Sequence, residues 1–135
     1  MGPDESRLKC SAEEIFAKGD RSGRFSDIEM VELTAEPRLI DFHLEALTGN
    51  EYLVMLREDL GEARVLFEEY VFEDVPAHRI IDFVDLLERG EVDLSFTRLK
   101  KQLILRVSVP EGTWVDGRRF RDDLSDWEKS VVERN

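Results

Sequence analysis

Residues 40–46 read IDFHLEA, and this stretch decides the fold class. Apolar and polar side chains alternate strictly through it, with Ile40, Phe42 and Leu44 on one side of the chain. Because successive side chains of a strand point to opposite faces of a sheet, this alternation is typical of a strand with one buried and one solvated face. The buried face needs a second layer to cover it, so the sequence predicts a layered fold.

Three neighbouring segments also predict strands. Residues 27–34 alternate with one slip in the pattern, which fits a strand with a bulge. A helix beginning at Ser26 is the alternative, but Pro37 would stop it early. Residues 52–57 are apolar on both sides, as in a central strand, and residues 64–73 follow a turn at Gly61. Short connections between consecutive strands favour an antiparallel meander of four strands.

The layer that covers this sheet is predicted after residue 76. Ile80, Phe83, Val84 and Leu87 are spaced i, i+3, i+4 and i+7, which places them on one face of an amphipathic helix. The helix is expected to begin between residues 74 and 76 and to end at Gly90. We therefore expect this apolar stripe to pack on the sheet face that contains Ile40, Phe42 and Leu44.

The remaining segments complete a mainly antiparallel α+β fold. Residues 92–97 and 103–109 alternate and predict two further strands, and a hairpin turning at Asp116-Gly117 would extend them. Capping boxes at Ser11 with Glu14, and at Ser125 with Glu128, predict short terminal helices. We expect a single α+β domain over residues 1–135, with residues 1–10 as a loose N-terminal arm.

Composition excludes several classes of site. One cysteine and two histidines cannot form an intramolecular disulfide or a thiolate metal cluster, so we expect no metal and no cofactor. The chain shows no secretory leader and no apolar run of membrane-spanning length, so a cytoplasmic location and no membrane partner are expected. Arginine outnumbers lysine 14 to 5, which is associated with bacterial proteins from GC-rich genomes.

Charge is distributed unevenly within a formal net charge of −12. Residues 27–93 carry 19 acidic and 5 basic side chains, whereas residues 94–121 carry 2 acidic and 7 basic ones. An acidic surface argues against nucleic acid, whose binding requires basic groups, and favours a basic protein partner. Acidity that serves only solubility remains an open alternative.

The acidic half offers candidate partner-binding residues. Glu68 and Glu69 lie in the predicted sheet region, and Asp82 and Asp85 lie on the outer side of the predicted helix. These four carboxylates are the expected contacts for a basic partner.

A second candidate is the polar side of residues 40–46. Asp41, His43 and Glu45 share one face of the predicted strand, about 7 Å apart in succession. A carboxylate beside an imidazole is the arrangement of a general base. The competing interpretation is the solvated side of a half-buried strand, which polar residues fill in any protein.

A third candidate is an anion site in the basic region. Arg118, Arg119 and Arg121 lie near Trp114 and Phe120, and guanidinium groups beside aromatic rings can grip phosphates or stack on bases. Pairing of these arginines with acidic residues of the same chain is the alternative.

No catalytic motif accompanies these candidates, so the leading hypothesis is a non-catalytic acidic module that docks on a basic partner. Immunity proteins that block the basic active sites of nuclease toxins are one such class, although only size and charge suggest it here. The alternative is a small-ligand-binding protein or enzyme with a cavity between the sheet and the helices. The oligomeric state is not indicated by the sequence.

Overall fold

The computed structural model of the chain describes residues 10–121 and 123–134, so the predicted arm of residues 1–10 lies almost entirely outside the described residues. The elements, in order, are α2 (Ala12–Ser22), β1 (Phe25–Ala35), β2 (Arg38–Ala46), β3 (Glu51–Arg57), η1 (Glu58–Leu60), β4 (Glu62–Phe67), β5 (Tyr70–Pro76), η2 (Ala77–Arg79), α3 (Ile80–Arg89), β6 (Asp93–Thr97), β7 (Gln102–Val109), β8 (Gly112–Arg119) and α4 (Asp126–Arg134).

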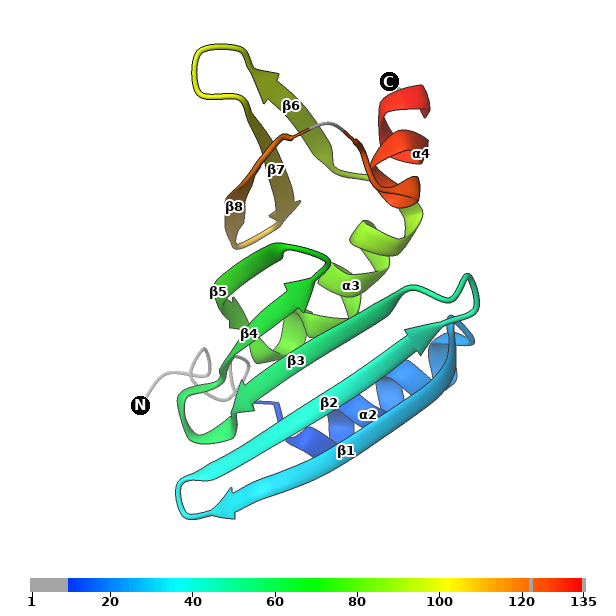
Figure 1. Ribbon diagram of the computed structural model, residues 1–135. Coiled ribbons are helices and arrows are strands. Elements are labelled where there is room, and N and C mark those ends of the chain that lie inside the picture. Colours follow the sequence, from blue (N-terminus) through cyan, green and yellow to red (C-terminus); the bar gives the residue numbers. More distant parts are fainter. Residues whose placement is uncertain (1–9, 122, 135) are drawn as a thin grey trace.

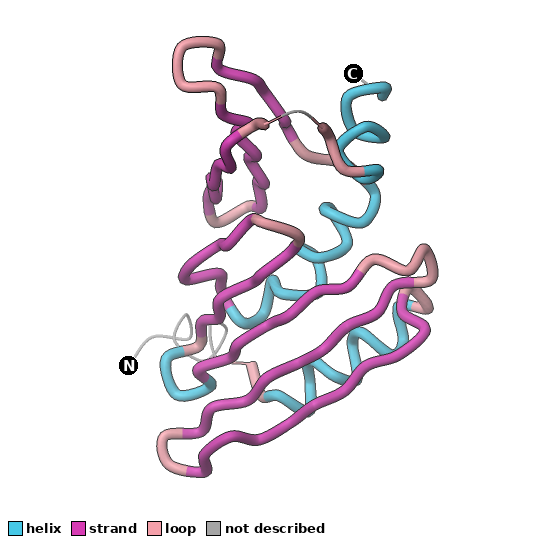
Figure 2. Tube along the Cα trace, in the orientation of Figure 1, coloured by secondary structure: helices cyan, strands magenta, loops and turns pink. Residues whose placement is uncertain are grey.

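The strands form two antiparallel sheets, which confirms the α+β class (Figures 1 and 2). The first sheet is a meander in the order β1-β2-β3-β4-β5, and the second has the order β6-β7-β8. The meander has five strands rather than the predicted four, because residues 64–73 turn at Glu68 and Glu69. Glu68 has a φ of 54°, which is a left-handed conformation. A glutamate is not a typical residue for this conformation, so the sequence contains no signal for the turn.

Both α2 and α3 cover the same face of the five-stranded sheet (Figure 1). Ile40, Phe42 and Leu44 on β2 are 1%, 0% and 2% exposed and belong to one buried cluster. The predicted stripe of α3, from Ile80 to Leu87, is fully buried in the same cluster. The predicted packing of helix on sheet is therefore confirmed, and α2, predicted as a short terminal helix, also covers the sheet, which the sequence did not predict.

The helix α2 packs unusually close to the sheet and to α3. Its start at the Ser11 capping box is as predicted, because the Ser11 hydroxyl accepts the Glu14 backbone N–H at 3.1 Å. A Cβ at Gly19 would meet Ile28 Cδ1 at 3.1 Å and Ile81 Cδ1 at 3.2 Å, so the glycine permits this approach. The helix continues past Gly19 and ends at Gly23, whose φ is 69°.

Two other boundaries differ from the expectation. Strand β5 continues to Pro76, and α3 begins only at Ile80 after the turn η2. The second hairpin turns at Pro110 and Glu111, so the Asp116-Gly117 pair lies inside β8. The glycine is needed there for space, since a Cβ at Gly117 would stand 2.9 Å from Ile104 Cδ1.

Side-chain groups join the two sheets. The backbone N–H of Val71 on β5 donates to the Asp116 carboxylate on β8 at 2.7 Å. The indole N–H of Trp114 donates to the Glu73 carbonyl, also at 2.7 Å. Some backbone hydrogen-bonding groups at the outer edge of β5 thus have partners, although no continuous strand ladder joins the two sheets in the described residues. These partners limit pairing of this edge with other chains.

Phe83 lies where α3, the first sheet and the second sheet meet. Its ring contacts Phe72 and Trp114 edge-on, with centroids 5.2 Å and 6.1 Å away, and it is fully buried. Replacing Phe83 with alanine should lower the free energy of unfolding by about 3–5 kcal/mol. The variant loses the free energy gained by burying the ring away from water, and it also contains a cavity where the ring was. Urea denaturation measures the loss, and a loss below about 1 kcal/mol would show that the stripe is not core.

Candidate functional site

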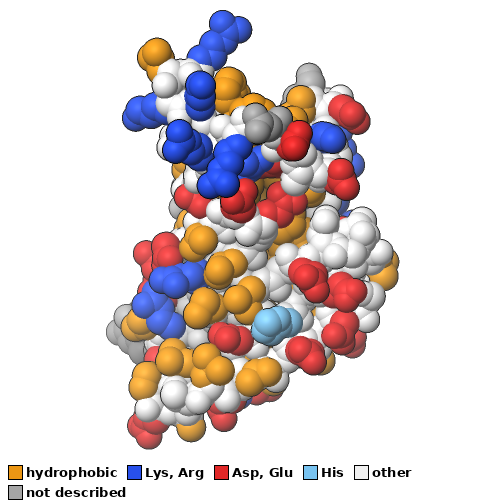
Figure 3. Space-filling view, viewed as in Figure 1, with side chains coloured by type: hydrophobic (Ala, Val, Ile, Leu, Met, Phe, Trp, Pro, Cys, Tyr) orange, Lys and Arg blue, Asp and Glu red, His pale blue; other side chains and the backbone are white. Residues whose placement is uncertain are grey.

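The face of the five-stranded sheet opposite α2 and α3 has no covering element among the described residues, and we call it the open face (Figures 1 and 3). Its membership follows from the strand register, since it consists of the residues that alternate with the buried ones. They include Asp27, Glu29, Val31, Leu33, Leu39, Asp41, His43, Glu45, Glu51, Leu53, Met55, Arg57, Glu62, Arg64, Leu66, Val71 and Glu73.

Three carboxylates lie side by side on neighbouring strands at one end of the open face. Asp27 on β1 is the direct partner of Glu45 on β2, and Glu45 is the partner of Glu51 on β3. We call these three residues the acidic row. All are exposed, and none makes an ion pair within the described part of the chain. Like charges that lie directly opposite each other destabilise a sheet. The acidic row therefore lowers the stability of the folded state, and folding alone does not explain its presence.

An apolar patch lies next to the acidic row (Figure 3). Val31, Leu33 and Val71 are 48%, 54% and 38% exposed. Leu53 and Leu66 pair directly across β3 and β4 and are half-buried, as are Leu39 and Met55. We call these seven residues the apolar patch. A contiguous exposed patch of this kind, bordered by charged groups, is typical of a protein interaction site.

The open face carries two shallow hollows. One has a volume of about 190 Å³ and is lined by Leu33, Leu39 and Met55, among others. The other has a volume of about 290 Å³ and includes the whole acidic row. Pockets for small ligands usually occupy about 300–1,000 Å³. Hollows of the observed size instead suit single side chains of a partner.

The predicted cluster of Asp41, His43 and Glu45 lies on the open face of β2. The cross-strand neighbours of His43 are Glu29 and Leu53, and the imidazole is exposed. No hydrogen bond joins the three side chains within the described residues. Their i, i+2 spacing along one strand keeps them apart, so they contribute to a surface rather than to an assembled catalytic group.

Asp82 and Asp85 are engaged by basic residues of the same chain. Asp82 pairs with Lys18 of α2 and with Arg79, each at 3.3 Å. Asp85 pairs with Arg89 at 3.0 Å and with Arg24 at 3.4 Å. The structure thus uses these carboxylates to connect α3 to α2 and the following loop, and their charge is largely compensated.

Glu68 and Glu69 lie in the β4–β5 turn, away from Asp82 and Asp85. Glu68 accepts a hydrogen bond from the Ser125 hydroxyl at 2.7 Å, and its pKa is raised mainly by burial. Glu69 pairs with Arg118 at 3.6 Å. The four predicted contact residues therefore form two separate groups, each with internal partners.

Arg118 is part of a buried network rather than an anion site. Its guanidinium donates to the fully buried Glu128 at 2.7 Å and 2.5 Å, and the Tyr70 hydroxyl donates to the same carboxylate at 2.5 Å. Glu128 also accepts the Ser125 backbone N–H at 2.8 Å, which is the predicted capping box of α4. Burial raises the pKa of Glu128, but the hydrogen bonds from Arg118 and Tyr70 outweigh it and hold this pKa below its ordinary value. Arg119 and Arg121 remain exposed.

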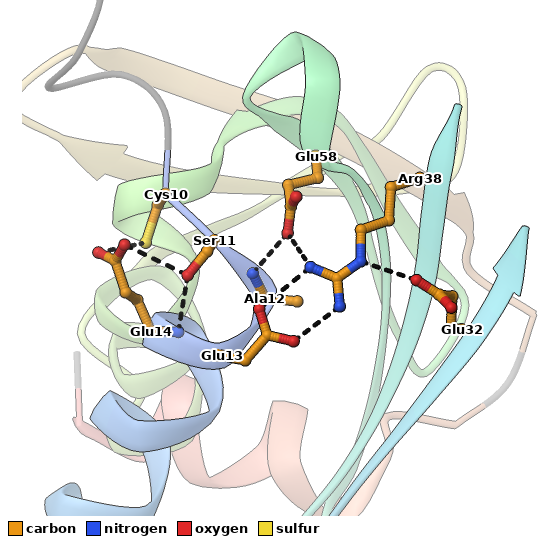
Figure 4. Close-up of polar contacts among 8 residues, drawn as sticks. All are labelled: Cys10, Ser11, Ala12, Glu13, Glu14, Glu32, Arg38 and Glu58. Carbon is orange, nitrogen blue, oxygen red and sulfur yellow. Dashed lines mark hydrogen bonds and ion pairs between the residues drawn. The ribbon is translucent and has the colours of Figure 1, made fainter. Parts of the chain in front are cut away.

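A second network, not predicted from the sequence, surrounds Arg38 at the start of β2 (Figure 4). Its guanidinium donates to Glu13 at 2.7 Å and 3.0 Å, to Glu32 at 2.8 Å and to Glu58 at 2.8 Å. Glu58 also accepts the first backbone N–H of α2, from Ala12, at 2.8 Å. The hydrogen bonds from Arg38 lower the pKa of Glu13 to about 2. This network attaches the start of α2 to the sheet.

Sequence reasoning missed the acidic row, although its members lie in segments predicted as strands or turns. The row becomes visible only when the register of β1, β2 and β3 is known, because its members are 18 and 6 residues apart. The hairpin between residues 46 and 51 was the available signal, since a short turn places Glu45 opposite Glu51.

Within residues 10–121 and 123–134, no group of three histidine, cysteine, aspartate or glutamate side chains is placed to hold a metal ion. No helix in this part of the chain is long and apolar enough to cross a membrane. Comparisons of the chain with protein-family models, with curated proteins and with solved structures found no match.

The Glu128–Arg118 pair generates a stability prediction. Replacing Glu128 with glutamine leaves the largely buried guanidinium of Arg118 with only the exposed Glu69 as counter-charge, which should cost about 3–5 kcal/mol of unfolding free energy at neutral pH. Because the pKa of Glu128 is lower in the folded than in the unfolded state, its contribution is complete above about pH 4.3 and declines as the pH falls further.

Chemical denaturation of both proteins from pH 7 down to about pH 3 checks this. The difference in stability should be largest at neutral pH and should shrink in acid. A difference that is independent of pH would show that the charge of Glu128 does not matter.

Proposed function

We propose that this chain is a non-catalytic acidic interaction module whose open face docks on a basic protein surface. The observation that carries the proposal is the juxtaposition of the acidic row, which has no cationic partner in the described residues, with the exposed apolar patch. Apolar contact would supply binding energy, and the carboxylates would accelerate encounter and select a basic partner.

Like-charge repulsion supports the assignment of the acidic row to binding. Basic groups of a partner would relieve the repulsion among Asp27, Glu45 and Glu51, so the complex gains an interaction that the free protein lacks. Asp82 and Asp85, in contrast, already have cations of the same chain beside them. The open face is thus a region where negative charge is available to another molecule.

A sheet is also a suitable platform for such a surface. The backbones of β1, β2 and β3 are held by cross-strand hydrogen bonds, so binding orders side chains but costs little backbone entropy. An immunity-type inhibitor of a basic toxin fits this description, because carboxylates in a rigid row can occupy positions where a nuclease accepts phosphates. We propose this class as the kind of partner.

The alternative of a ligand cavity between sheet and helices finds little support. Phe42, Phe72 and Phe83 fill that space and are 0%, 1% and 0% exposed, and Tyr52 beside them is 2% exposed. The Tyr52 hydroxyl is occupied by a 2.7 Å hydrogen bond to Glu88. Side chains therefore occupy the volume that a ligand would need.

Neutralising the acidic row should preserve or improve stability. The variant D27N/E45Q/E51Q removes two directly opposed like-charge pairs, each worth a few tenths of a kcal/mol and up to about 1 kcal/mol. Urea denaturation in low salt should show equal or higher unfolding free energy than the native protein. A loss of more than about 1 kcal/mol would mean that the row stabilises the fold and is not a binding feature.

The same variant should lose the partner. Immobilised native protein and D27N/E45Q/E51Q are compared for what they capture from a lysate of the source organism, with D20N/D59N/E133Q as control. The control removes the same charge at exposed positions outside the open face. A basic protein captured by the native and control proteins, but not by the acidic-row variant, is expected.

Kinetics with that protein then test the mechanism. The association rate should fall at least about tenfold between low and high salt, because steering by the carboxylates is screened. Equal capture by native protein and acidic-row variant, or association that does not depend on salt, would contradict the proposal.

A further inference from the structure

A second surface lies at the far end of the β6–β7 hairpin. Leu99 is at the turn between β6 and β7 and is completely exposed, with a relative exposure of 101%. Arg98 precedes it, and Lys100 and Lys101 follow it. From Leu94 to Pro110 the chain contains no acidic residue. The turn therefore presents an exposed apolar side chain flanked in the sequence by cations.

The end of β8 adds two more cations to this turn. Arg119 is the cross-strand partner of Gln102, and the backbone N–H of Phe120 donates to the Lys101 carbonyl at 2.8 Å. Arg121 follows directly. We call the surface formed by Phe96, Arg98, Leu99, Lys100, Lys101, Arg119, Phe120 and Arg121 the basic tip. Figure 3 shows lysine and arginine side chains gathered over this part of the molecule.

The cations of the basic tip are available to another molecule. None of the five makes an ion pair within residues 10–121 and 123–134. The other two basic residues of the second sheet behave differently, because Arg106 pairs with Asp93 at 3.7 Å and Arg118 pairs with Glu128. The second sheet thus carries two kinds of cation: Arg106 and Arg118 form ion pairs within the described part of the chain, and the five cations of the basic tip do not.

The apolar groups of the tip are exposed on one face while the cations are not confined to that face. Phe96 is 48% exposed and contacts Phe120 edge-on, with ring centroids 5.4 Å apart. Phe96 shares its face with Leu103 and Arg118 through the register, so Arg119 points to the opposite face. The positive charge therefore surrounds the end of the hairpin.

We propose that the basic tip docks the protein, end-on, on an anionic lipid surface. Leu99 and Phe96 enter the boundary between headgroups and acyl chains, while the lysine and arginine stems extend so that their charged ends stay at the phosphates. The expectation of no membrane partner considered only spanning segments, and a hairpin tip needs none.

The geometry favours a lipid surface over a single-stranded nucleic acid. A strand of nucleic acid is bound in a groove that aligns cations and aromatic faces on one side, whereas here the cations surround an apolar apex. An exposed leucine at that apex offers nothing to a phosphate or a hydrogen-bonding base edge. It does gain free energy from transfer out of water into the lipid boundary.

The acidic body of the protein is compatible with this docking. The second sheet extends away from the first (Figure 1), and the eight residues of β7 span about 26 Å. Screening in about 0.1 M salt reduces charge interactions beyond roughly 10 Å, so the open face contributes little repulsion at the membrane.

Co-sedimentation with vesicles tests the proposal. Native protein should bind phosphatidylcholine vesicles that contain about a third phosphatidylglycerol, and should not bind pure phosphatidylcholine. Lys100→Glu should weaken the binding at least about fivefold, whereas the matched charge reversal Arg21→Glu, on exposed α2 surface, should change it less than about twofold. Leu99→Ser should also weaken it.

Insertion is checked separately with Leu99→Trp. Its emission should shift to shorter wavelength with anionic vesicles, beyond any change in the native protein, and brominated lipid should quench it. Equal binding of native protein to both kinds of vesicle, no binding to either, or bound Leu99→Trp without a shift would overturn the proposal. Binding of a fluorescent single-stranded oligonucleotide that Lys100→Glu abolishes, without vesicle binding, would assign the tip to nucleic acid instead.

Discussion

Burial of one face of the β1–β5 sheet under α2 and α3 is the interaction on which the rest of the structure depends. The meander supplies a continuous apolar surface through Ile40, Phe42 and Leu44, and the stripe of α3 completes the core. Because both helices lie on the same side, the other side is left without a covering layer in the described residues. The open face and its apolar patch are consequences of that one-sided packing.

Local periodicity predicted the elements that bury apolar side chains. The alternation in residues 40–46 and the helical spacing from Ile80 to Leu87 reflect burial directly, so strand, helix and their contact were all predictable. The Ser11 cap and the Ser125 capping box formed for a similar reason, since they depend on residues three positions apart. Turns were less predictable, because Glu68 adopts a left-handed conformation without a glycine and Gly117 serves packing inside a strand. The acidic row required cross-strand register, which single-segment patterns do not contain.

The net charge of −12 divides into a structural and an available part. Carboxylates around Arg38 and Arg118 connect α2 and α4 to the sheets, and the two arginines compensate part of their charge. The acidic row and the basic tip are two groups of the available part, with opposite sign and in different sheets. A sequence count cannot make this division, because it depends on which charges folding brings together.

Strand β1 lies at the edge of the five-stranded sheet, and one side of its backbone has no strand partner in the described residues. An unpaired edge strand of eleven residues with exposed Val31 and Leu33 is ordinarily a site where the backbone of a second copy can pair and start aggregation. Asp27 and Glu29 on one face, with Glu32 on the other, oppose such pairing because two copies would align like charges. Selection against self-association would therefore preserve acidity along β1 even in a relative that had lost its partner.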